Sequence, residues 1–207
     1  MVEYFVNGGP FMWPILILLI AGLGISGERF YSLIMSSTNT KEFFDDVIKS
    51  LDNDGIDNTI ELCNNTPGPV AEIFHAGLSR FHRGLREVEK AVQDAGGLEM
   101  SFLEKNMIWM NAVITIAPML GFTGTVAGMV NAFDAIAAAN DISPAVVAGG
   151  ISQALLTTAF GLIVAMIIQI FQNFFVSMID KLILDMEENS VKFMDQLHLE
   201  YEKLAQS

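Results

Sequence analysis

The chain has 207 residues, of which 52% are apolar, and its mean hydropathy of +0.44 is higher than that of an ordinary soluble domain. Its formal net charge of −13 argues against nucleic-acid binding, because a protein that binds phosphates needs a positive surface. The single cysteine, Cys63, excludes a disulfide within the chain.

Three windows of the sequence, residues 4–27, 106–133 and 142–179, contain no charged side chain. A helix needs about 20 residues to cross the hydrocarbon core, so each window is long enough for one membrane span. The third window exceeds one span, and an apolar stripe continues beyond it to Leu197, which predicts a single helix much longer than the bilayer is thick. The alternative, three buried helices of a soluble protein, fits poorly because soluble folds rarely contain uncharged windows of this length.

The basic residues predict which side of the membrane each connection faces. Residues 1–28 and 134–141 contain none, whereas eight of the eleven lie within residues 29–105 and three within residues 181–203. Cytoplasmic connections carry the excess of Lys and Arg, so the N-terminus is expected outside and the C-terminus in the cytoplasm. No basic residue precedes the first apolar run, which is atypical of a cleaved secretory signal.

The region between the first two spans is predicted to be helical. Apolar residues recur at helical spacing in residues 41–51 and 70–81, and the turn-forming stretches DNDG (52–55) and NNTPGP (64–69) separate the helices. From Leu85 the apolar pattern runs through Leu98 and Phe102 into the second span, and only Gly96–Gly97 interrupts it. The fold class is therefore an all-α membrane protein with three transmembrane helices and long cytoplasmic helical extensions.

Small residues recur every three or four positions in the second and third spans, which places them on one face of each helix. Such faces let helix backbones approach closely within a membrane. The positions predicted to serve helix packing are Pro118, Gly121, Gly124, Gly128, Gly150 and Gly161.

Four polar residues lie among these small ones: Thr125, Gln153, Thr157 and Thr158. Hydroxyls can bond back to carbonyls of their own helix, so packing alone is one interpretation. An amide and several hydroxyls at similar depth favour a polar or hydrated interior instead. We therefore predict that these four residues line an ion pathway.

These segments also carry a family resemblance. APMLGFTGTVAGMVNAF (117–133) followed by GGISQALLTTAFGL (149–162) resembles the MotA/TolQ/ExbB proton-channel family, and ExbB/TolQ more closely than MotA. The order of three spans and the outer N-terminus agree with this family. Thr125 and Thr158 stand where the family has its pore threonines.

The resemblance implies a particular assembly in the inner membrane. Five copies of the chain would form a ring around two single-span, Asp-bearing partners similar to ExbD or TolR, which act on a TonB- or TolA-like protein. Lipids and further copies of the chain are the other expected partners. The corresponding division of the chain is a periplasmic N-terminus (1–10), spans at 11–28, 106–134 and 144–177, a cytoplasmic domain (29–105), a periplasmic loop (135–143) and a cytoplasmic tail (178–207).

One departure from the family concerns Gln153, because the family often has Glu there. An amide cannot exchange a proton at physiological pH, so a titratable relay on this chain is in doubt. Either the partner's Asp carries the protons or the neutral lining admits Na⁺, and we favour protons. Asp134 and Asp141, which flank the outer loop, are expected to be interfacial charges, or a carboxylate ring at a pore mouth.

Other classes of function fit less well. Ser152 lies within the third span, but all three histidines lie outside the spans, so no base for nucleophilic catalysis is evident and no enzyme is expected. No metal site or other cofactor is expected either, since His75 and His82 have no evident third ligand. A non-conducting membrane scaffold remains the alternative, although it leaves Gln153, Thr157 and Thr158 unexplained.

Overall fold

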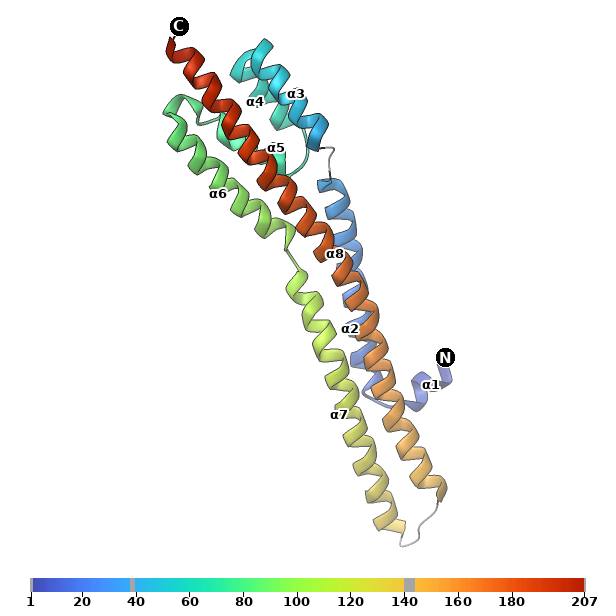
Figure 1. Ribbon diagram of the computed structural model, residues 1–207. Helices are drawn as coiled ribbons and strands as arrows, with labels where there is room; N and C mark the ends of the chain where they lie inside the picture. The colour runs from blue at the N-terminus through green and yellow to red at the C-terminus, as the bar shows by residue number, and fades with distance from the viewer. Residues whose placement is uncertain (1, 38–39, 140–143, 207) are drawn as a thin grey trace. The chain divides into compact units, whose positions relative to one another are not determined.

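The computed structural model describes residues 2–37, 40–139 and 144–206, and these residues form helices and short connections without strands (Figure 1). The all-α fold predicted from the sequence is thereby confirmed for the described residues. The α-helices are α1 (Val2–Asn7), α2 (Met12–Ser36), α3 (Thr40–Asn53), α4 (Gly55–Asn65), α5 (Pro69–Leu78), α6 (Leu85–Leu103), α7 (Met107–Ala139) and α8 (Pro144–Gln206). A short 3-10 helix, η1 (Phe81–Arg83), precedes α6.

Three helical stretches, which include α2, α7 and α8, are long and apolar enough to cross a membrane. This confirms the three spans expected from the uncharged windows. The third span and the tail form the single helix α8 of 63 residues, about 95 Å long at 1.5 Å per residue. The predicted loop at 135–143 differs in part, because α7 continues to Ala139; residues 140–143, including Asp141, lie outside the described residues.

The chain divides into two compact units. Unit 1 comprises Met1–Arg29 and Asn106–Phe174, and unit 2 comprises Phe30–Lys105 and Phe175–Ser207. Helices α2 and α8 therefore contribute to both units. The candidate polar residues of the second and third spans all belong to unit 1.

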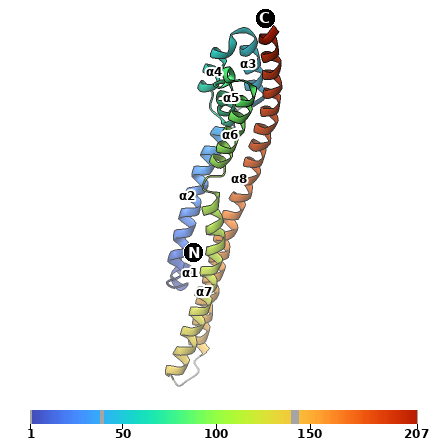
Figure 2. The same ribbon diagram turned by 90° about the vertical axis from the view of Figure 1, so that its left-hand side faces the viewer.

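Unit 1 is built from α7, the first half of α8 and the first part of α2. Helices α7 and α8 lie side by side in both views (Figures 1 and 2). Helix α2 approaches both of them at Gly22, where a side chain would lie 2.7 Å from Ile168 Cδ1 and 3.4 Å from Val113 Cγ1. Many large apolar side chains of unit 1, such as Phe122 and Ile170, are exposed, as expected for side chains that face lipid.

Unit 2 is built around large apolar side chains. Phe74 of α5 stacks on Phe193 of α8 with ring centroids 4.1 Å apart, and Phe43 of α3 stacks on Phe74 at 5.8 Å. All three rings are buried. Figure 2 shows α3 to α6 gathered beside the C-terminal part of α8, which supplies the apolar stripe predicted from the sequence.

The predicted helix breaks in unit 2 are confirmed at two places. Helix α3 ends at Asn53 and α4 begins at Gly55, whose φ of +82° favours glycine. Helix α4 ends at Asn65, and α5 begins at Pro69 after Gly68, whose φ is +129°. The turn-forming residues thus act where their backbone preferences place them.

The predicted continuity of the helix from Leu85 into the second span is wrong. Helix α6 passes through Gly96–Gly97 without interruption and ends at Leu103 instead. Asn106, with a φ of +65°, separates α6 from α7, and asparagine tolerates this left-handed conformation better than most residues. Leu98 and Phe102, which the pattern assigned to the apolar face, are 72% and 50% exposed.

Candidate functional site

The small residues of α7 and α8 face each other within one chain. A Cβ atom added to Gly121 would lie 2.9 Å from the Thr157 carbonyl oxygen, and one added to Gly161 would lie 2.5 Å from the Ala117 carbonyl oxygen. These neighbours are backbone atoms, which cannot move aside as a flexible side chain does. The two helices therefore approach each other as closely as glycine allows.

The other predicted packing residues extend this contact along both helices. A Cβ atom at Gly128 would lie 3.0 Å from the Cβ of Ala154, and one at Gly150 would lie 2.5 Å from the Cβ of Ala132. Gly124 lies against the Thr157 side chain. Pro118 lies inside α7. The contact thus extends at least from Ala117 to Ala132 on α7.

Two of the four predicted ion-pathway residues come together at this contact. The hydroxyls of Thr125 and Thr158 are hydrogen-bonded to each other. Thr158 also donates to the carbonyl of Gly121 at 3.0 Å, and Thr125 lies 3.1 Å from the carbonyl of Ala154. Both side chains are half-buried, so this hydroxyl pair is held by backbone carbonyls and remains accessible from one side.

The chemistry of the hydroxyl pair follows from its proton count. Each hydroxyl has one proton to donate and two lone pairs that accept. The two carbonyls and the partner hydroxyl provide enough acceptors for both hydroxyl protons. Lone pairs of the two hydroxyl oxygens therefore stay free on the accessible side. The pair can accept a hydrogen bond from a carboxylic acid or coordinate a cation. It can also donate to a carboxylate when one hydroxyl releases its hydrogen bond to a backbone carbonyl.

Thr157 is placed differently from the pair. Its side chain is 1% exposed and lies in the α7–α8 contact, where the hydroxyl donates to the carbonyl of Ala154 at 2.8 Å. A second carbonyl, that of Gly121, lies at 3.3 Å. This burial favours a packing role for Thr157 over the pore-lining role expected from the sequence.

Gln153 does not join the hydroxyl pair. Its amide nitrogen lies against Gly9 in the turn between α1 and α2, where an added Cβ would be only 2.0 Å away. Gly9 has a φ of +77°, so glycine suits both the turn and the close approach of the amide. In this chain Gln153 therefore contacts the N-terminal turn.

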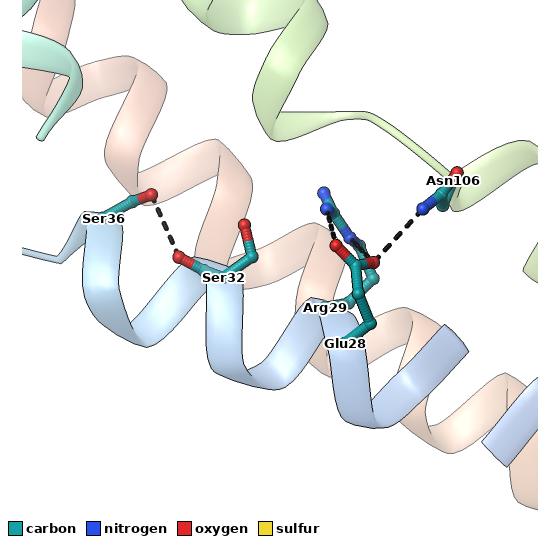
Figure 3. A network of polar contacts seen from close by, with 5 residues as sticks. All are labelled: Glu28, Arg29, Ser32, Ser36 and Asn106. Carbon is teal, nitrogen blue, oxygen red and sulfur yellow. Dashed lines mark hydrogen bonds and ion pairs between the residues drawn. The ribbon is translucent and has the colours of Figure 1, made fainter. Parts of the chain in front are cut away.

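A polar cluster in unit 1 was missed by the sequence reasoning. Arg29, which is 1% exposed, donates to both carboxylate oxygens of Glu28 at 2.8 Å and 2.5 Å, and Asn106 donates to Glu28 at 3.2 Å (Figure 3). A buried guanidinium requires such a partner. The signal was present, because Glu28 and Arg29 directly follow the first uncharged window. In unit 2, Ser36 donates to the Ser32 carbonyl of its own helix at 3.0 Å.

Two groups of unit 2 have raised pKa values. Burial, and then repulsion by Glu72, raises the pKa of the Glu99 carboxyl above its usual range. Burial raises the pKa of the Cys63 thiol to about 12, so this thiol is unreactive at neutral pH. In the part of the chain that the structure describes, no group of three or more His, Cys, Asp or Glu residues is arranged to hold a metal ion.

Together, these helices define a multi-pass membrane protein with a close glycine contact and a hydroxyl pair on its second and third spans. The family model of the MotA/TolQ/ExbB proton channel family matches residues 65–188. Because this match covers more than half of the chain, the chain belongs to that family, as the resemblance predicted.

Three relatives illustrate the range of the family. A biopolymer transport protein ExbB homolog of Methanothermobacter thermautotrophicus is 31% identical over 185 residues, which cover 86% of this chain and 64% of the relative. The Tol-Pal system protein TolQ of Pseudomonas aeruginosa is 34% identical over 108 residues, 46% of each chain. The biopolymer transport protein exbB1 of Vibrio cholerae is 25% identical over 168 residues, 76% of this chain and 71% of the relative. The match thus spans less than two thirds of the archaeal relative.

Proposed function

We propose that this chain is the channel subunit of an inner-membrane motor that uses the proton motive force to energise transport or maintenance of the cell envelope. Its family supports a channel, and relatives named for biopolymer transport and for the Tol-Pal system indicate the type of process. The N-terminus is periplasmic and the C-terminus cytoplasmic in this proposal, because basic residues flank the spans on one side only.

The observation that carries the proposal is the half-buried Thr125–Thr158 hydroxyl pair. It lies in spans whose uncharged windows, 106–133 and 142–179, contain no carboxylate. Hydroxyls can stabilise both forms of a carboxyl group but do not titrate at physiological pH. The group that carries the proton therefore belongs to another chain.

An ExbD- or TolR-like protein with one span and an Asp in it fits this requirement. A ring of copies, with five expected from the family resemblance, places one hydroxyl pair per copy around a central partner. Two partner copies would offer their carboxyls to successive pairs as the ring and the partner turn relative to each other. A TonB- or TolA-like protein would then receive the motion.

The test compares threonine-to-valine variants of the pair with a matched control in vesicles that contain the chain and its partner. Thr125→Val and Thr158→Val keep the shape of the side chain and remove the hydroxyl. The control is Thr123→Val, because Thr123 is exposed on the same helix and bonds only back to the Met119 carbonyl, at 2.8 Å. Proton flux under a pH gradient is the readout, and native mass measurement follows ring assembly.

We expect each pair variant to assemble and its flux to fall about tenfold, since a membrane hydrogen bond is worth ~0.6–2 kcal/mol and 1.4 kcal/mol is tenfold in rate. Thr123→Val should behave as the wild type. Equal flux in all variants would exclude a role for the hydroxyl pair. Wild-type vesicles that conduct nothing would favour a non-conducting scaffold.

Sodium is the second candidate ion, because a neutral lining of hydroxyls can also coordinate Na⁺. Repeating the measurement under a sodium gradient at constant pH separates the two ions. Flux that follows sodium and ignores the pH gradient would replace the proton in this proposal. The position of the hydroxyl pair would remain the same.

A further inference from the structure

Three amide side chains of unit 1 lie near the ends of the uncharged windows that the proposed orientation places in the cytoplasm. Asn111 belongs to α7, and Gln169 and Asn173 belong to α8. Asn111 and Asn173 are exposed, and Gln169 is half-buried. An amide that faces lipid is costly, so the surroundings of these side chains need an explanation that helix packing does not give.

The three amides lie on the accessible side of the hydroxyl pair. At 100° per residue, Asn111 is turned about 40° from Thr125 around α7. Around α8, Gln169 and Asn173 are turned about 20° and 60° from Thr158. Each turn leads away from the glycines of the α7–α8 contact. Because α7 and α8 run antiparallel (Figure 1), turns in the same direction lead to the same side of the helix pair.

Helix α2 lies on the other side of this helix pair. Its Gly22 approaches Val113 of α7 and Ile168 of α8. These two residues are turned about 120° and 80° from the hydroxyl pair, in the direction opposite to the amides. Helix α2 therefore leaves the amide side of α7 and α8 open.

The amides of the two helices lie at nearly the same level. Gly161 of α8 lies against Ala117 of α7, which fixes the register of the two helices. In the cytoplasmic direction, Asn111 is six residues from Ala117, and Gln169 is eight residues from Gly161. At 1.5 Å per residue these amides differ in level by about 3 Å, and they lie about 16–21 Å from the hydroxyl pair.

An apolar interval separates the amides from the hydroxyl pair. Leu162 and Met166 lie between Thr158 and Gln169 on the same side of α8, and they are 47% and 58% exposed. An apolar lining holds water poorly and can interrupt a water-filled path. The amides are thus the first polar side chains of α8 on this side beyond that interval.

The hydrogen bonds of these amides leave polar atoms free for water. Gln169 Nε2 donates to Asn173 Oδ1 at 2.9 Å, and neither side chain forms another hydrogen bond with a described residue. An amide has two protons to donate and an oxygen that accepts, so Gln169 Oε1 and Asn173 Nδ2 are available. Nearby on α8, Gln172 Oε1 is buried and has no hydrogen-bond partner among the described residues. Water is the usual partner of such a buried oxygen.

We propose that Asn111, Gln169 and Asn173 hold the water through which the transported cation, a hydrated proton or Na⁺, passes between the hydroxyl pair and the cytoplasm. The amides themselves do not titrate, so the water carries the ion and the amides keep that water in place. This inference rests on the proposed function, because it names the cytoplasmic end of the same pathway.

Labelling of introduced cysteines in the full-length chain tests whether water reaches the amides. Gln169→Cys is compared with Ile170→Cys, and Asn173→Cys with Phe174→Cys. Each control residue is exposed, lies one position nearer the cytoplasm and is turned 100° around the helix. The probe is a membrane-impermeant trimethylammonium methanethiosulfonate added to inverted membrane vesicles. Cys63 does not compete, because its thiol is buried and its pKa is about 12.

We expect the two amide positions to react about tenfold faster than their controls, because a thiol reacts as the thiolate, which forms in water and not in lipid. Simple closeness to the cytoplasm would give the opposite order, since each control position is the nearer one. Asn111→Cys should react at a rate similar to Gln169→Cys, because the two positions share one level.

Ion flux tests whether this water belongs to the pathway. Asn111→Leu, Gln169→Leu and Asn173→Leu remove the hydrogen-bonding groups. In vesicles that contain the chain and its partner, we expect each to lower the flux about 2- to 10-fold, the effect of one net hydrogen bond on a rate. Asn173→Gln, which keeps an amide, and Phe174→Leu should retain most of the flux. The loss should appear under a pH gradient for protons, and under a sodium gradient at constant pH for Na⁺.

Three outcomes would overturn the inference, and each has its own pattern. Amide positions that react no faster than their controls, in a chain that conducts, show that these side chains face lipid or dry protein. Fast labelling with unchanged flux in all three leucine variants shows that the water lies off the pathway. Both results leave the proposed function intact. A wild-type chain that conducts under neither gradient removes the proposed function and this inference with it.

Discussion

Unit 1 and unit 2 hold their helices together by opposite means. In unit 1, α7 and α8 meet through glycine and alanine, and an added Cβ at Gly161 would lie 2.5 Å from a carbonyl oxygen. In unit 2, the helices meet through large rings such as Phe74 and Phe193, which are fully buried. The same helix, α8, takes part in both contacts.

The solvent explains the difference. In water, a buried phenylalanine stabilises the fold because its apolar surface leaves water. In lipid that gain is absent, since the acyl chains are as apolar as the side chain, so close backbone approach and hydrogen bonds hold the helices instead. Unit 1 accordingly exposes large apolar residues such as Phe122 and Ile170 and buries the Thr157 hydroxyl between its helices.

Truncating a buried aromatic ring in unit 2 is expected to have the largest effect, because large apolar side chains hold the helices of unit 2 together. Phe193→Ala should destabilise unit 2 by about 3–5 kcal/mol, the usual cost of truncating a buried ring. Hydrogen exchange of the α5 and α6 amides should accelerate accordingly. The matched control is Phe122→Ala in unit 1, whose exposed ring should be nearly dispensable. Equal losses at both positions would contradict the contrast between the units.

Adding a methyl group to a glycine is expected to destabilise unit 1, where the helices are in close backbone contact. Gly161→Ala should destabilise the α7–α8 contact by about 1–3 kcal/mol, the range for overpacking, because its neighbour is a backbone carbonyl. Gly24→Ala, at a helical glycine with nothing within 4 Å, should be neutral or slightly stabilising. Denaturant titration of helicity in mixed micelles measures both. Tolerance of Gly161→Ala would mean that the helices are not held at glycine distance.

Much of this architecture was predictable, because it depends on long sequence signals. Uncharged windows fix three spans, and glycine- and proline-rich stretches fix the breaks before Gly55 and Pro69. The break at Asn106 was not predictable, since it depends on one residue adopting a positive φ against an unbroken apolar pattern. A pattern also cannot tell that Leu98 and Phe102 stay exposed, because burial depends on which helices come to pack there.

The candidate site was predictable in part for a similar reason. Thr125 and Thr158 share the small-residue faces, so helical spacing brings them to the same contact. Spacing did not distinguish Thr158 from Thr157, although one is half-buried and the other fully buried. The contact of Gln153 with Gly9 joins residues far apart in the sequence and has no local signal.

The smallest predicted effect concerns the charge of one partly buried carboxyl group in unit 2. The Glu99 carboxyl of α6 is partly buried and close to Glu72 of α5, and both factors raise its pKa. A folded-state pKa above the unfolded value means that the native state holds its proton more tightly. Stability from this group is therefore complete below the ordinary glutamate pKa of about 4.3 and is lost as the pH rises through the raised value.

Glu99→Gln removes the ionised carboxyl and keeps a side chain of the same shape. We expect the thermal midpoint of unit 2 to rise at pH 7 by at most about 3 °C, because the carboxyl is partly solvated and the repulsion is screened. Below about pH 4 the variant and the wild type should melt together, since Glu99 is then protonated in both states. Glu72→Gln should give part of the same gain, because it removes the repulsion but not the burial. A variant that gains stability equally at pH 4 and pH 7 would show that the gain comes from packing and that the charge of Glu99 is immaterial to unit 2.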